Sequence, residues 1–343
     1  MHRSLKSLHR WLATLSFVTT SNSLDAPYAA TAATGRFATD ALHFTAIAAH
    51  AEVSTTARLG YSVPEDSTID LDIRLTPLRE QASLHEEGVE ILDASEELKA
   101  VGISEENLDL HEQAQRIAIG AVLLHAVERR FGVRPIHLAD TSRISGNATY
   151  GEATVRDTSS PTLRNSHHCF HMDKNWRSIG MMLNSSAAEA VERTIDNYRG
   201  LWAADWSRMG VRQQDAAAAM LDDDAGMMVN AWVALTGKIE QQPLALIDRR
   251  SVQINSGSVL TMPVILPGLE ESITMLRAST AENATFLWRP SMRFGEVLLF
   301  RTVDTPHSAV VLPGKRDSPR RSAEMRMLLL FETEATSKLG SPG

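Results

Sequence analysis

Cysteine is nearly absent from this chain, because Cys169 is the single one among 343 residues. An intrachain disulfide is therefore impossible, and the fold has to rest on a hydrophobic core, which a chain of this length is able to bury. The sequence also lacks any apolar run of about eighteen residues, the length that spans a bilayer. Stable membrane insertion is therefore not expected.

Net positive charge is lacking as well. The chain carries 34 Lys and Arg against 42 Asp and Glu, which gives a formal net charge of −8. The acidity is concentrated from Pro64 to Glu112, where fifteen acidic side chains face three basic ones. Nucleic-acid binders hold phosphates through clustered basic residues, so a nucleic-acid partner is not expected.

The first 24 residues are basic and contain no acidic side chain. They carry Arg3, Lys6 and Arg10 and a short apolar run from Trp11 to Val18. This pattern is typical of a targeting leader, and a variable extension is the alternative. Since no disulfide requires an oxidising compartment, we expect a cytoplasmic location.

One helix is predicted in the first half of the chain, from Ser104 to Gly132. Its first turn holds Glu105 and Glu106, and basic residues precede the glycine, in agreement with the rules for helix ends. A strand is expected directly afterwards, up to Asp140. A polar loop over 142–166 and helices over 186–199 and 213–221 are expected to follow.

The second half changes to short apolar runs separated by Gly, Pro, Asp and Ser. Such runs predict strands at the spacing of a β-sandwich or barrel. The expected fold class is α+β, with helices flanking a largely antiparallel β core. The predicted strands are Met227–Ala234, Leu244–Ile247, Val259–Ile265, Thr285–Trp288, Glu296–Phe300, Ser308–Leu312 and Glu324–Phe331.

Histidine is unevenly distributed, because none occurs between His171 and His307. On a strand, alternate residues face the same side, so His171 and Asp173 direct an imidazole and a carboxylate toward one point. His307 is the single downstream histidine able to complete a set of two histidines and one carboxylate. This set leaves positions open on an octahedral ion and is the one that holds Fe(II) for oxygen chemistry.

Other interpretations of this cluster stay open. His171 and Asp173 could form an ordinary surface or salt-bridged pair. Cys169 is near enough to suggest a zinc site, although no second cysteine exists for a usual structural site. A nucleophilic role for Cys169 lacks an evident base and orienting group. The remaining histidines of the cluster, His167 and His168, are either donors to metal ligands or exposed side chains.

Polar residues enter the last predicted strand with a period of two. Arg320, Ser322, Glu324 and Arg326 share one face of it. A guanidinium that faces the interior of a barrel needs an anion, and a dicarboxylate accepts bidentate hydrogen bonds from it. The alternative is a basic rim in water, which fits Arg326 less well because its strand is apolar.

Six short motifs occur in an order that resembles one enzyme family. They are His171-x-Asp173, Asn230-Ala-Trp232 with Pro243-Leu-Ala-Leu-Ile-Asp248, Trp288-Arg-Pro, Gly295-Glu-Val-Leu-Leu-Phe300, Thr305-Pro-His307-Ser-Ala and Pro319-Arg-Arg-Ser-Ala-Glu-x-Arg326. From about Asp70 to Glu332 the chain resembles the AsaB/CmcJ-type hydroxylase and desaturase family, and more distantly phytanoyl-CoA hydroxylase-like enzymes. The family's Asn-x-Trp-Arg-Pro segment is Asn-Ala-Trp-Val-Ala here, so a substrate contact from that arginine does not carry over.

The resemblance implies a double-stranded β-helix core of the jelly-roll, cupin-like type. It also implies an Fe(II)- and 2-oxoglutarate-dependent dioxygenase that hydroxylates or desaturates a small organic molecule with molecular oxygen in secondary metabolism. The implied iron ligands are His171, Asp173 and His307, and 2-oxoglutarate is held by Arg320 with Ser322 or by Arg326. A metal-free cupin-like binding module and a metal-dependent oxygenase or zinc hydrolase without 2-oxoglutarate are the alternatives. No oligomeric state is predicted.

These inferences divide the chain into three parts. Residues 1–45 are expected to be an N-terminal extension that is disordered or has a targeting role. Residues 46–335 are expected to form a single oxygenase domain, with an α/β part over 46–165 and the β-helix core over 166–335. A tail over 336–343 completes the chain.

Overall fold

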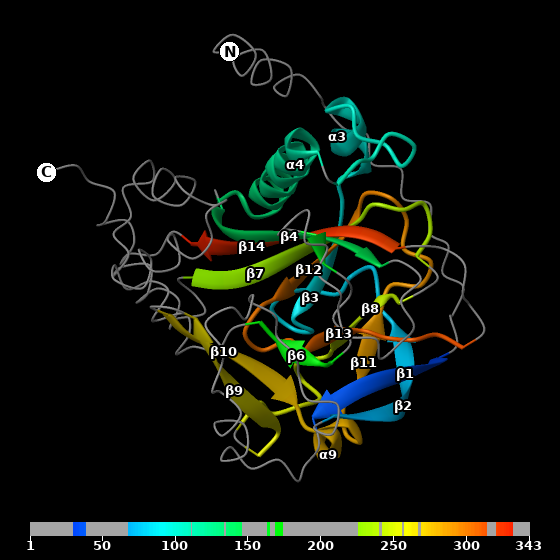
Figure 1. Ribbon diagram of the computed structural model, residues 1–343, viewed down its shortest axis with the longest axis vertical. Coiled ribbons are helices and arrows are strands. Elements are labelled where there is room, and N and C mark those ends of the chain that lie inside the picture. The colour runs from blue at the N-terminus through cyan, green and yellow to red at the C-terminus, as the bar shows by residue number, and fades with distance from the viewer. Residues whose placement is uncertain are drawn as a thin grey trace, which may run out of the picture.

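Two β-sheets lie face to face, and the two longer helices cover the outer side of the smaller sheet (Figure 1). The computed structural model describes residues 30–38, 68–110, 112–133, 135–145, 163–164, 169–173, 226–239, 242–255, 257–266, 269–313 and 320–331. Within these residues no helix is long and apolar enough to cross a membrane.

The larger sheet has eight strands and is nearly closed. In chain order they are β1 (Thr31–Ala38), β2 (Thr68–Pro77), β6 (His171–Met172), β8 (Leu244–Ile247), β9 (Val259–Leu266), β10 (Leu269–Leu276), β11 (Phe286–Trp288) and β13 (His307–Ala309). Their order in space is β1-β2-β11-β8-β13-β6-β10-β9. The second edge of β1 forms bridges to Val311, Cys169 and Arg277, so the sheet curls back on itself like a barrel.

The smaller sheet has six strands. They are β3 (Val89–Asp93), β4 (Ile136–Ser145), β5 (Leu163–Arg164), β7 (Gly226–Ala234), β12 (Glu296–Arg301) and β14 (Arg320–Leu330). Their order is β3-β12-β7-β14-β4-β5, and every residue of β7 is buried. A strand that is covered on both faces needs a nearly continuous apolar run, which is what β7 has.

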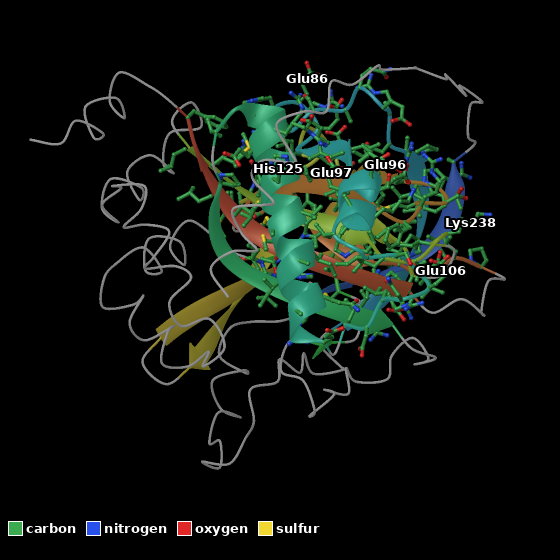
Figure 2. The ribbon with its side chains drawn as sticks, turned by 90° about the horizontal axis from the view of Figure 1, so that it is seen from above. Glu86, Glu96, Glu97, Glu106, His125 and Lys238 are labelled. Atoms are coloured by element: carbon green, nitrogen blue, oxygen red, sulfur yellow. The ribbon has the colours of Figure 1, made fainter. Side chains whose placement is uncertain are left out.

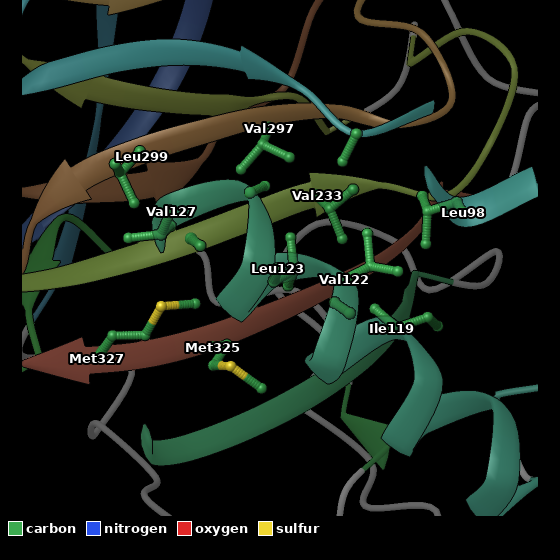
Figure 3. Close-up of a cluster of buried hydrophobic side chains, with 14 of the residues drawn as sticks. Leu98, Ile119, Val122, Leu123, Val127, Val233, Val297, Leu299, Met325 and Met327 are labelled. Atoms are coloured by element: carbon green, nitrogen blue, oxygen red, sulfur yellow. The ribbon is translucent and has the colours of Figure 1, made fainter. Parts of the chain in front are cut away.

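Helices α3 (Ser95–Ala100) and α4 (Gln113–Phe131) lie on the outer face of the six-stranded sheet. Figure 3 shows that Leu123 and Val127 of α4 pack against Val233 of β7 and Met325 of β14. Part of the acidic segment faces solvent, since Glu86, Glu96 and Glu106, labelled in Figure 2, are exposed. Glu87 and Glu90 of the same segment are buried, so the charge concentration in the sequence is only partly a solvent-facing surface.

Two further hydrophobic clusters hold the sheets. One lies between them and includes Trp232 and Phe300 from the smaller sheet and Leu246 from the larger one. The other packs on the opposite face of the larger sheet and includes Phe170 and Met172, along with the short helix α9 at Ala278–Ala281. Because side chains alternate along a strand, His171, which lies between Phe170 and Met172, points toward the space between the sheets.

The main helix begins later than the sequence predicts. We expected it from Ser104, but α4 starts at Gln113. Local hydrogen bonds compete with the helix: the Asn107 side chain accepts from the Ser104 N–H at 2.8 Å and donates to the Gly102 carbonyl at 2.8 Å. The predicted end is confirmed, since Gly132 has a φ of 69° and caps the helix in the left-handed region.

The predicted strands of the second half are all present, although with shifted ends. β14 begins already at Arg320, and β4 continues to Ser145, into the segment expected to be a loop. Five strands were not predicted: β1, β2, β3, β5 and β10. The helices expected over 186–199 and 213–221 lie outside the described residues, as do His167 and His168.

The N-terminal extension predicted for residues 1–45 needs a correction, because β1 belongs to the eight-stranded sheet. Its sequence is rich in Ala and Thr and has no strong strand pattern of its own. β1 becomes a strand through antiparallel pairing with β2 along its whole length, from Thr31 opposite Leu75 to Ala38 opposite Thr68. A pairing with a partner so distant in sequence leaves no local signal.

Candidate metal centre

Three potential metal ligands converge between the two sheets. His171 lies on β6, Asp173 follows this strand, and His307 begins β13, directly opposite His171 in the antiparallel pair. The ligand atoms of these side chains all lie within 4.8 Å of one another. The Nε2 atom of His171 is 3.7 Å from Asp173 Oδ1, and the Nε2 atom of His307 is 3.5 Å from Asp173 Oδ2.

Backbone carbonyls orient both imidazoles. The Nδ1 atom of His171 lies 2.7 Å from the Cys169 carbonyl oxygen, and that of His307 lies 3.2 Å from the Thr305 carbonyl oxygen. A carbonyl only accepts hydrogen bonds, so each Nδ1 carries the proton. The Nε2 atoms, which face Asp173, are then the ring nitrogens that a metal ion would use.

The protonation states of the cluster also suit a cation. Burial, with the neighbouring His171, lowers the pKa of His307 to about 3. Burial alone would raise the pKa of Asp173, but Arg326 and the two histidines hold that pKa well below its usual value. At neutral pH the His307 imidazole is therefore uncharged and the Asp173 carboxylate is ionised, which are the forms that bind metals.

Two side chains hold the carboxylate of Asp173. A guanidinium nitrogen of Arg326 donates to Oδ1 at 2.5 Å, and the Nδ2 amide of Asn230 donates to Oδ2 at 2.6 Å. The same two donors reach Glu324 Oε1, at 3.1 Å from Arg326 and 3.3 Å from Asn230. On the other side of Asn230, the hydroxyl of Thr302 donates to Oδ1 at 2.6 Å.

A cavity connects the cluster with the start of β14. Its polar lining includes Arg320, which is buried, lies over the Trp232 ring at 5.2 Å and donates to the Gln242 carbonyl. The hydroxyl of Ser322 is fully buried and has no hydrogen-bond partner among the described residues. The residues around the cavity are His171, Trp232, Leu244, His307, Ser308, Ala309, Arg320 and Glu324.

The predicted polar face of the last strand is therefore real, but its two arginines lie at different places. Arg320 lines the cavity, whereas Arg326 contacts Asp173 and Glu324. Sequence reasoning assigned no role to Thr302 and named Asn230 only as part of the Asn230-Ala-Trp232 motif. Their link to Asp173 depends on packing between distant strands, so no local pattern indicates it.

Cys169 does not join the ligand cluster. Among the described residues the group of possible ligands consists of His171, Asp173 and His307. The thiol is buried, its Sγ lies 3.5 Å from the sulfur of Met275, and burial raises its pKa to about 12. A zinc site with Cys169 and a thiolate nucleophile are therefore both disfavoured. A surface location of the His171 and Asp173 pair is wrong, because these side chains are 3% and 9% exposed.

Comparisons with known proteins agree with this architecture. A family model described as an oxidoreductase/YMDC permease-like domain matches residues 204–330. Among solved structures, the iron and alpha-ketoglutarate-dependent endoperoxidase NvfI is similar, with a TM-score of 0.54 and 14% identity over 89% of this chain and 99% of that chain. The same protein in a different conformation gives a TM-score of 0.53 and 15% identity over 90% and 100% of the two chains.

The likeness shows a shared fold. It covers nearly the full length of both chains. A comparison with curated proteins found no match.

Proposed function

We propose that this protein is an Fe(II)- and 2-oxoglutarate-dependent oxygenase that hydroxylates or desaturates a small organic molecule. The observation that carries the proposal is the buried set of His171, Asp173 and His307 beside a cavity that Arg320 also lines. The fold shared with an iron and alpha-ketoglutarate-dependent enzyme supports it. We propose further that the two sheets are the double-stranded β-helix of the AsaB/CmcJ-type family.

The donor set fits Fe(II). Two imidazole nitrogens and one carboxylate converge, and both histidines line the cavity. Such a set leaves positions for a bidentate cosubstrate and for oxygen. When bound, the iron and 2-oxoglutarate supply the oxidising chemistry with molecular oxygen, and the protein supplies orientation and a dry site.

Charge balance favours a dianionic cosubstrate. Arg326 contacts the carboxylates of Asp173 and Glu324, and Arg320 lines the same cavity as Glu324, so two acidic and two basic side chains around the site balance in charge. A divalent cation then leaves two uncompensated positive charges in a buried place. Uncompensated buried charge is costly, and a dicarboxylate such as 2-oxoglutarate removes it.

Arg320 is the better candidate to hold the far carboxylate of 2-oxoglutarate. It lies in the cavity lining, and the Trp232 ring and the Gln242 carbonyl hold its guanidinium in place. Ser322, two residues along the same face, brings a buried hydroxyl that has no partner among the described residues. Arg326 is already engaged with Asp173 and Glu324.

Apolar side chains form part of the cavity wall, with Trp232 and Leu244 beside the ligand histidines. Apolar walls exclude water from a site where a reactive oxidant forms. They also favour a small organic substrate, in line with the resemblance to hydroxylases and desaturases of secondary metabolism. Fold likeness does not carry the identity of that substrate.

Anaerobic titration with Fe(II), followed by an oxygen-dependent assay of succinate release from 2-oxoglutarate, tests the proposal. We expect one bound iron per chain and succinate formation in the native protein. His307→Ala should abolish both. His125→Ala, on α4 and away from the site (Figure 2), is the matched control and should change neither.

Two outcomes would contradict this function. Absence of stoichiometric iron binding would favour a metal-free binding module. Iron binding without 2-oxoglutarate consumption, tested with broad sets of small organic molecules, would favour an oxygenase or hydrolase that uses no such cosubstrate.

A further inference from the structure

We propose that Asn230, oriented by Thr302, is a positioning residue that acts through Asp173 to determine how this carboxylate binds the metal. The inference rests on the metal site of the proposed function. It concerns a buried polar network between β7, β12 and β14, which a purely structural core would not need. Buried polar groups are costly unless they are hydrogen-bonded, so a buried hydrogen-bonded network beside a ligand needs an explanation.

Strand register places the network. Asn230 lies at the centre of β7, opposite Arg326 on β14 and opposite Phe300 on β12. Directly opposed residues share a face, so Asn230 and Arg326 both project toward Asp173. A shift of either strand by one residue would turn one donor to the other face, where α4 packs.

The hydrogen bond from Thr302 fixes the orientation of the Asn230 side-chain amide relative to the carboxylates. The Thr302 hydroxyl lies 2.6 Å from Oδ1 and donates to it, since an amide oxygen only accepts. Nδ2 is then directed at Asp173 Oδ2, at 2.6 Å, with Glu324 Oε1 at 3.3 Å. In the flipped amide, an oxygen would face two carboxylates and the hydrogen bonds would be lost.

The result is a carboxylate held at both oxygens. Asn230 bonds Oδ2 and Arg326 bonds Oδ1, so Asp173 cannot rotate about its terminal bond without breaking one of them. Each carboxylate oxygen has two acceptor sites, so one site on each oxygen stays available for a metal ion on the side of the two histidines. Partners of this kind orient metal ligands, and their loss typically lowers metal affinity about 10–100-fold.

Asn230 is the right member of the network to test because it is neutral. Substitution of Arg326 would also remove a positive charge beside the cation, which by itself strengthens cation binding and hides the effect of lost orientation. Asn230→Leu removes both amide groups at similar volume and changes no charge. Thr302→Val removes the orienting hydroxyl and leaves every contact of Asp173 in place.

The experiment measures Mn(II) affinity and the visible absorption of the Co(II)-substituted protein. For Asn230→Leu we expect roughly 10–100-fold weaker Mn(II) binding and altered Co(II) bands, because Asp173 then changes its orientation. Thr302→Val should change the bands in the same direction with a smaller loss of affinity. The control is Thr236→Val, because the Thr236 hydroxyl is buried without a partner among the described residues, and it should match the native protein.

Wild-type affinity and Co(II) bands in Asn230→Leu would overturn the inference. If that variant does not fold, Thr302→Val decides in its place, and wild-type bands there would overturn the orienting role of Thr302. Failure of the native protein to bind Mn(II), Co(II) or Fe(II) is a different result, because it overturns the proposed function itself.

Discussion

Phe37 stacks face to face on Phe170, with ring centroids 4.9 Å apart and an interplanar angle of 9°. The backbone N–H of Phe170 also donates to the Arg36 carbonyl at 2.9 Å. Phe170 directly precedes His171, so β1 fixes the segment that carries the first ligand of the metal centre. A strand close to the N-terminus of the described chain thus supports a site built from residues far along the sequence.

Phe37→Ala should destabilise the protein by about 3–5 kcal/mol, since it removes a fully buried ring and leaves a cavity. Urea unfolding measures the effect, and metal affinity of the folded variant should also fall because His171 is held less firmly. Ile117→Ala is the control, because this side chain on α4 is 62% exposed and its loss should cost less than about 0.5 kcal/mol. Equal costs for both variants would show that β1 is not part of the core.

Cys169 should be unreactive in the native protein. Burial raises the pKa of its thiol to about 12, so the nucleophilic thiolate is scarce at any moderate pH. A thiol reagent such as 5,5′-dithiobis(2-nitrobenzoate) should modify it only after unfolding. Cys169→Ala should keep the native metal affinity, and loss of metal binding in this variant would restore the zinc interpretation.

Arg320 and Arg326 should differ in what their substitution changes. Arg320→Lys loses the planar fork that binds a carboxylate, so the 2-oxoglutarate concentration for half-maximal turnover should rise about 10-fold or more, with unchanged Co(II) bands. Arg326→Lys should alter the Co(II) bands through Asp173 and change the 2-oxoglutarate requirement less. The reverse pattern would assign the cosubstrate to Arg326.

The metal-free protein should lose stability as the pH falls through the range in which His307 titrates. Burial, with the neighbouring His171, lowers the pKa of this group from 6.5 to about 3 in the folded state. Between these values the unfolded chain binds the proton and the folded protein does not, so the free energy of unfolding decreases as the pH decreases. One group contributes at most about 1.4 kcal/mol per pH unit.

The measurement for this prediction is urea unfolding of the metal-free native protein and of His307→Gln between about pH 7 and about pH 4. The variant lacks the titrating imidazole, so its stability should depend less steeply on pH than that of the native protein. Parallel curves for the two proteins would mean that His307 is not held neutral in the folded state.

Local patterns predicted the parts of the site that lie on single strands. Period two placed His171 and Asp173 together and gathered the polar face from Arg320 to Arg326, and the structure has both arrangements. The end of α4 at Gly132 was also predicted from the local sequence. These features depend on neighbouring residues, whose geometry the backbone repeat dictates.

Pairing between distant strands was not predictable in the same way. The Ala- and Thr-rich β1 has no strand signal apart from its partner β2, and the side-chain bonds of Asn107 delayed the start of α4. The different positions of Arg320 and Arg326 could not be separated by periodicity either, because both lie on the same face. Only the location of Asp173 between β6 and β14 separates them.

The sequence by itself determined which residues are able to take part. It has one cysteine and therefore no intrachain disulfide, no histidine between His171 and His307, and a polar face on its last, otherwise apolar strand. Tertiary structure decided how they combine. It set His307 opposite His171, enclosed Asp173 between Asn230 and Arg326, and buried Cys169 away from the ligands. The physical reason is that side-chain periodicity is encoded locally, whereas strand register and burial depend on the packing of the whole chain.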